Sequence, residues 1–85
     1  MNNLTATGEI YGETLTLQRV SKRTAKKLFS EGKRVFIQPS NYYPFGAWYN
    51  AMEIHEDFDR VSTEYAWYNC DSERGYYPSF YVQVN

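Results

Sequence analysis

The sequence predicts an α+β fold in which one main helix, at about residues 21–31, packs on a mostly antiparallel sheet of four to six strands. Three observations predict this fold. One stretch has helical periodicity with clear start and stop signals, alternating apolar runs flank it on both sides, and short turn sequences join neighbouring runs. Eighty-five residues are enough for a single domain, which we expect to span residues 1–85.

The predicted helix has a recognisable beginning, buried face and end. Ser21 is suited to the N-cap, where its hydroxyl oxygen accepts a hydrogen bond from an amide of the first turn. Ala25, Leu28 and Phe29 form a narrow apolar stripe at helical spacing. Gly32 is placed to adopt the left-handed conformation that closes a helix.

Strands are predicted where apolar and polar residues alternate. Thr5–Ile10 and Glu13–Arg19 form a first hairpin with a glycine in its turn. A strand at residues 34–38 follows the helix, and an irregular loop separates it from a further strand at residues 47–54.

Residues 61–70 fit two patterns, because apolar side chains recur there both at helical spacing and in alternation. The turn sequence at residues 71–75 favours the second pattern, a hairpin that pairs Thr63–Asn69 with Tyr76–Val84. Since Pro78 cannot donate a ladder hydrogen bond, its part of this hairpin is expected at a sheet edge or a bulge.

The single cysteine and the absence of targeting signals indicate a cytoplasmic protein. Cys70 excludes an internal disulfide, and a lone thiol fits a reducing compartment. Its position at the end of a predicted strand is typical of a buried, inert thiol. The first residues lack the basic and apolar regions of a signal peptide, and no apolar run approaches the length of a membrane span.

The net charge of −1 conceals a split between the two halves of the chain. Residues 1–42 carry seven basic and three acidic side chains, a net charge of +4, whereas residues 43–85 carry two basic and seven acidic ones, a net charge of −5. If the fold keeps the halves apart, the domain has one cationic and one anionic side.

Few residues in this sequence are suited to catalysis or to metal binding. His55 is the only histidine, and although it lies among carboxylates, no second histidine or cysteine stands at ligand spacing. Cys70 would need a base to act as a nucleophile, and His55 is the only imidazole available. The sequence therefore predicts no enzyme, no metal site and no cofactor.

The first candidate binding surface is the basic helix and the residues that follow it. Six cations on one side of a domain can neutralise phosphates of a nucleic acid, although a pI of 5.7 argues against this role. The alternative is an ordinary solvated helix face. The six residues are Lys22, Arg23, Lys26, Lys27, Lys33 and Arg34.

The second candidate surface combines an aromatic loop with the acidic half of the chain. The loop side chains are suited to anchoring a protein partner or stacking on bases, and they are equally suited to covering one end of the core. They are Tyr42, Tyr43 and Phe45. The carboxylates, suited to a basic partner surface, are Glu53, Glu56, Asp57, Asp59, Asp71 and Glu73.

A resemblance adds to this interpretation. Ser21–Pro39, together with Phe58–Val61, Tyr68–Cys70 and Phe80–Val82, is similar to small proteins of phages and other bacterial mobile elements. The similarity extends over about two-thirds of the chain, involves structural motifs, and carries over no site residue. It implies a one-domain, cytosolic, non-enzymatic protein, and many such proteins are anti-CRISPR or other anti-defence inhibitors that occupy a surface on a host nuclease complex.

Two functions are therefore expected. The first is a non-enzymatic inhibitor that binds a bacterial defence (CRISPR-Cas) nuclease complex through the acidic and aromatic surface. The alternative is a small nucleic-acid-binding or regulatory module that uses the basic helix and the aromatic loop. In either case we expect the protein to bind a macromolecule in the host cytoplasm, with no role for a membrane.

Overall fold

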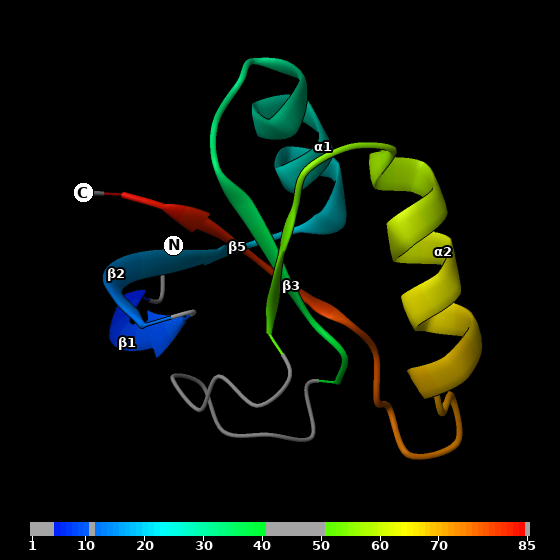
Figure 1. Ribbon diagram of the computed structural model, residues 1–85. Helices are drawn as coiled ribbons and strands as arrows, with labels where there is room; N and C mark the ends of the chain where they lie inside the picture. Colours follow the sequence, from blue (N-terminus) through cyan, green and yellow to red (C-terminus); the bar gives the residue numbers. More distant parts are fainter. Residues whose placement is uncertain (1–4, 11, 41–50, 85) are drawn as a thin grey trace.

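The last strand in sequence order, β5 (Ser79–Gln83), lies at the centre of the sheet. The computed structural model describes residues 5–10, 12–40 and 51–84. Within these residues five strands lie in the order β1-β2-β5-β3-β4, and all neighbours are antiparallel (Figure 1). The elements are β1 (Thr5–Ile10), β2 (Glu13–Val20), α1 (Lys22–Ser30), β3 (Val35–Gln38), β4 (Met52–Ile54), α2 (Phe58–Asn69) and β5 (Ser79–Gln83). The predicted α+β class, main helix and strand number are confirmed.

Helix α1 begins and ends at the predicted residues. The hydroxyl oxygen of Ser21 accepts a hydrogen bond of 3.2 Å from the Thr24 amide, as an N-cap does. At the other end Gly32 has a φ of +87°, which glycine adopts without steric cost. The amides of Gly32 and Lys33 donate to the carbonyls of Phe29 and Leu28, both at 3.0 Å. This Schellman motif satisfies the last carbonyls and directs the chain into β3.

The hairpin predicted for residues 63–69 and 76–84 is wrong, because residues 58–69 form helix α2. The helical period prevails since it buries Phe58 and half-buries Val61 and Tyr65 on one side, whereas an alternating pattern would have buried Trp67, which is largely exposed. Strand β5 pairs instead with β2 and β3.

Three smaller expectations change with α2. Pro78 precedes β5 rather than lying within an edge strand, so its missing donor costs the central ladder nothing. Cys70 is exposed at the end of α2 and is not a buried strand residue. The strand predicted at residues 47–54 is present as β4, at Met52–Ile54, and its first four residues lie outside the described part of the chain.

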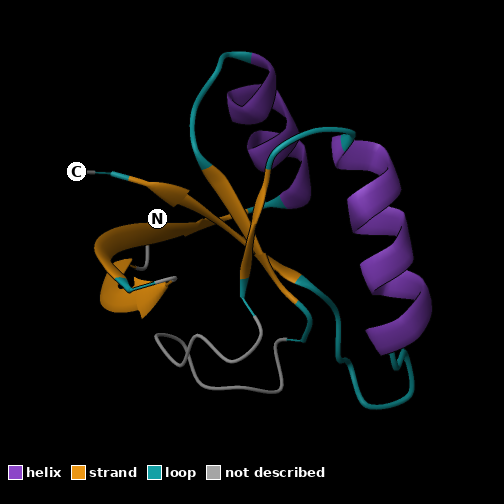
Figure 2. Ribbon diagram, viewed as in Figure 1, coloured by secondary structure: helices purple, strands orange, loops and turns teal. Residues whose placement is uncertain are grey.

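Both helices cover the same face of the sheet, where they share one apolar core (Figure 2). Ala25 of α1 and Phe58 of α2 pack there with Val35, Ile37 and Phe80 of the central strands. The ring centroid of Phe58 lies 5.6 Å from that of Phe80, a stacked contact. Aromatic contacts of this kind give the small core much of its buried area.

The β1–β2 hairpin covers the opposite face. Ile10, Leu15 and Leu17 of this hairpin form a second core with Phe36 of β3 and Tyr81 of β5. Strand β2 pairs with β5 over its last four residues, so the rest of β2 extends past the central strand with β1 as its neighbour. In Figure 1 the hairpin accordingly projects on the side of the sheet away from α2.

The basic and acidic halves of the sequence are interleaved rather than kept apart. The central position of β5 places the end of the chain between two strands of the first half. Lys26 of α1 forms an ion pair of 2.9 Å with Asp59 of α2, and Arg34 forms one of 2.8 Å with Glu53 of β4. These contacts join the halves, so the dipole expected from their separation is reduced.

Candidate functional site

One of the six predicted acidic residues, Glu53, is held inside the fold. Its side chain is 13% exposed. Both of its carboxylate oxygens accept hydrogen bonds from Arg34, at 2.8 Å from Nη2 and 3.1 Å from Nε. This bidentate geometry is the strong form of the ion pair, so Glu53 is unsuited to a partner surface.

The other five acidic residues form two groups at opposite ends of α2. Glu56, Asp57 and Asp59 are exposed at its amino end, whereas Asp71 and Glu73 follow its carboxyl end (Figure 1). A helix of twelve residues is about 18 Å long at about 1.5 Å per residue. The structure therefore spreads the predicted acidic surface along α2 instead of gathering it at one point.

Five of the six predicted basic residues are exposed, and the exception is Arg34. Besides Glu53, this guanidinium donates two hydrogen bonds of 3.1 Å to Glu13, and it lies 5.4 Å from the ring centroid of Phe36. The hydrogen bonds to Glu53, and then those to Glu13, raise the pKa of Arg34 above its ordinary value. Arg34 thus stabilises the fold and cannot contact a phosphate in the same conformation.

The first turn of α1 is positively charged. Lys22 and Arg23 are exposed there, and the turn contains no acidic residue. Because the amino end of a helix carries a partial positive charge, cations in this turn reduce helix stability. Their presence is therefore not explained by the stability of α1.

The predicted aromatic loop, with Tyr42, Tyr43 and Phe45, lies outside the described residues. Among the described residues the large exposed aromatic side chains are Trp67, at 81%, and Tyr77, at 46%. Trp67 is not among the site residues that the sequence predicts. A helical projection of residues 58–69 would have placed it opposite Phe58, because nine residues are about two and a half helical turns.

We call the aromatic and acidic residues in and after the last turns of α2 the terminal patch: the exposed Glu64, Trp67, Glu73 and Tyr77, and the half-buried Asp71. An ordered turn follows the helix there. The amide of Asp71 donates to the Tyr76 carbonyl at 2.8 Å, and the amide of Tyr76 donates to the Asp71 carbonyl at 2.9 Å. These two hydrogen bonds hold the backbone of residues 71–76, which carries part of the patch.

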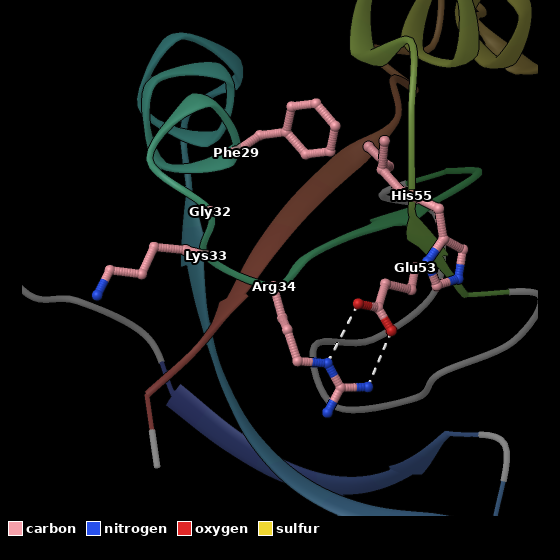
Figure 3. Close-up of a pocket in the computed structure, with 7 residues that line it drawn as sticks. Phe29, Gly32, Lys33, Arg34, Glu53 and His55 are labelled. Atoms are coloured by element: carbon pink, nitrogen blue, oxygen red, sulfur yellow. Dashed lines mark hydrogen bonds and ion pairs between the residues drawn. The ribbon is translucent and has the colours of Figure 1, made fainter.

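A cleft of about 250 Å³ lies where α1 leads into β3 and where β4 ends (Figure 3). The bonded pair of Arg34 and Glu53 forms part of its lining, and the side chain of Lys33 extends away from that pair. The described residues that line the cleft are Phe29, Gly32, Lys33, Arg34, Glu53, Ile54 and His55.

The chemistry that this cleft can support is limited by its internal hydrogen bonds. The Glu53 carboxylate already accepts two of them from Arg34. His55 precedes α2 and Cys70 follows it, so the length of that helix separates the imidazole from the thiol. Among the described residues no group of three potential metal ligands is present.

Comparisons of the whole chain do not provide a functional assignment. No protein-family model, no curated protein and no solved structure matches it. In the part of the chain that the structure describes, neither helix is long and apolar enough to cross a bilayer. The function is therefore argued from the charge and shape of the surface.

Proposed function

We propose that this protein is a non-enzymatic inhibitor of the anti-CRISPR type, which binds a bacterial defence nuclease complex in the host cytoplasm through the acidic surface along α2. The charge of residues 56–74 carries this proposal. They contain six acidic and two basic side chains, a net charge of −4, of which the pair of Asp59 with Lys26 of α1 offsets one. All of the acidic side chains are exposed except Asp71, which is half-buried.

The target follows from electrostatic complementarity. A nuclease that holds nucleic acid needs a cationic channel, and an acidic protein surface is attracted to the same field. Complementary charge increases the rate of association and selects the orientation of docking. Glu53, which pairs with Arg34 inside the fold, takes no part, and Glu64 on the exposed side of α2 joins the acidic surface.

The test measures capture of purified CRISPR nuclease–guide complexes and protection of a targeted phage. The double variant Glu64→Gln with Glu73→Gln should lower the association rate about tenfold at low salt, with a smaller loss at high salt. Glu9→Gln with Glu31→Gln is the matched control, because it removes two exposed carboxylates that lie outside the acidic surface, and it should change the rate less. If no complex is retained and no phage is protected, the proposal is wrong.

A second candidate function is supported by the cationic first turn of α1. Lys22 and Arg23 oppose the helix dipole there, and Lys27 and Lys33 are also exposed. Together these residues form a surface for the phosphates of a nucleic acid. Lys26 contributes less, because it is paired with Asp59.

Titration with short DNA and RNA at low and high salt tests this second function. Binding that weakens steeply with salt and falls further in Lys27→Glu would support it, since each phosphate contact adds about −0.7 to −0.9 to the salt slope. Absence of binding at low salt would reject it.

A further inference from the structure

Trp67 lies on the face of α2 that points away from the core. Phe58, 4% exposed, lies half a turn round the helix from it and packs against the sheet. Trp67 is 81% exposed, so its indole contributes almost nothing to either core. A side chain that buries roughly 150–250 Å² when covered is therefore available for a partner.

The surroundings of Trp67 are acidic. Glu64 lies one helical turn before it, the spacing at which side chains on a helix are neighbours. Asp71 and Glu73 follow in the hydrogen-bonded turn at the end of the helix. Two arginines, at positions 60 and 74, pair with Glu64 and Asp71 at 3.1 Å and 3.6 Å.

These two ion pairs leave the carboxylates able to change partner. Both pairs are local, spaced by three or four residues, and their side chains are 41–74% exposed. Exposed pairs of this kind contribute little to stability and are screened by salt. Among the described residues no ion pair of Glu73 is recorded, so the patch has anionic character beyond its local pairs.

An exposed indole one helical turn from a carboxylate, on a segment in which three carboxylates outnumber two arginines, favours a cationic partner. The face of tryptophan attracts a guanidinium or an ammonium group more strongly than the other aromatic side chains do, and arginine is the more frequent partner. Carboxylates beside the ring bind the same groups through charge-assisted hydrogen bonds. A nucleic acid would also find a ring to stack on, but its phosphates would be repelled by the acidic residues of the patch.

We infer that the terminal patch is a docking site for an arginine- or lysine-rich segment of a protein, with one cationic side chain of that segment stacked on the indole of Trp67. This inference rests on the proposed function and specifies the part of the nuclease complex that is bound. Tryptophan and arginine are the residue types that most often dominate binding energy at interfaces.

The first experiment uses a short peptide of alternating arginine and serine, with a glutamate–serine peptide as its counterpart. The indole N–H resonance of Trp67 is assigned as the one missing from the spectrum of Trp67→Phe. We expect the arginine peptide to shift this resonance to saturation and the glutamate peptide to leave it unchanged. Trp67→Ala should weaken peptide binding roughly tenfold, and Trp67→Phe by less. Thr14→Ala, at an exposed position of β2 outside the patch, is the control and should bind as the original protein does.

The inference is overturned if the arginine peptide leaves the Trp67 resonance in place, or if Trp67→Ala binds the peptide undiminished. It is also overturned if a single-stranded oligonucleotide moves this resonance and the arginine peptide does not. Because Trp67 is exposed, its replacement leaves the fold intact, which circular dichroism verifies.

A second experiment separates this inference from the proposed function. Capture of a purified nuclease complex is measured with the original protein and with Trp67→Ala. Equal capture by both overturns the inference and supports the proposed function. Binding of the arginine peptide at Trp67 without capture of any nuclease complex supports the inference and overturns the proposed function.

Discussion

The two faces of the sheet are covered by different means. On one face two helices bury an aromatic and aliphatic core in which Phe58 contacts both Phe29 and Phe80. On the other face a two-stranded hairpin contributes three aliphatic side chains to the core, and Arg34 joins its residue Glu13 to Glu53 of β4. The first face relies mainly on apolar contact, since its ion pair between Lys26 and Asp59 is exposed, whereas the second combines apolar contact with the part-buried pair of Arg34 and Glu53.

This difference predicts unequal responses to solution conditions. Apolar burial depends little on pH, so the packing of the two helices on the sheet should remain stable over a wide range of pH. A hairpin joined to only one central strand over half its length is the kind of unit that opens locally. The contact between Arg34 and Glu13 should therefore make this opening depend on pH.

The largest effect is expected on the helical face. Phe58→Ala should lower the free energy of unfolding by about 4 kcal/mol, because it removes a buried ring at the centre of the core. Thermal and urea unfolding measure the loss. Trp67→Ala, an aromatic deletion on the same helix, is the control and should cost less than about 0.5 kcal/mol. Similar losses in both variants would contradict the assignment of the buried side of α2.

An intermediate effect is expected beneath the hairpin. Leu17→Ala should cost about 3 kcal/mol, since the side chain is fully buried between the hairpin and the sheet. Amide exchange should accelerate most in β1 and β2, while the amides of α1 and α2 change less. Thr16→Ala, at the neighbouring half-buried position, is the control. Uniform acceleration through the whole chain would show that the two faces do not open separately.

The smallest effect is the response of the hairpin to acid. Hydrogen bonds from Arg34 lower the pKa of Glu13 below its ordinary value of 4.5. A lowered pKa in the folded state gives stabilisation that is present above the unfolded value and is lost as the pH falls through the folded value. Amide protection in the hairpin should therefore stay constant down to about pH 5 and decrease in stronger acid.

Two variants isolate this contribution. Glu13→Gln should remove part of the acid dependence of hairpin protection, and Arg34→Met should remove at least that part, because it also breaks the pair with Glu53. Glu9→Gln replaces an exposed carboxylate on the same hairpin and serves as the control. If Glu13→Gln retains the acid dependence of the original protein, the ion pair with Arg34 does not hold the hairpin.

Local signals predicted much of this fold. The bounds of α1 follow from residues in and next to the helix: the N-cap Ser21, the apolar stripe that begins at Ala25, and Gly32. The structure confirms these bounds. The first hairpin likewise follows from alternation and a glycine turn. Elements whose signals are local are the ones that sequence reasoning identifies.

The missed features depend on contacts distant in the chain. Residues 61–70 carry both periodicities, and the choice between them is made by the burial of Phe58 against Phe80 of β5. Contacts between residues distant in the chain also explain why the candidate surfaces differ from those predicted. Arg34 and Glu53 were predicted as surface charges, but the pairing of β3 with β4 places them in hydrogen-bond contact. The exposure of Trp67 follows from the helical conformation of α2, which was not predicted.

The central position of β5 has a consequence for synthesis on the ribosome. Ser79–Gln83 joins β2 to β3, both of which are translated much earlier. Until this strand emerges from the exit tunnel, the hairpin and the β3–β4 pair cannot be united, and the apolar faces of both remain accessible to chaperones. Folding of the nascent chain is therefore expected to finish in a single late step.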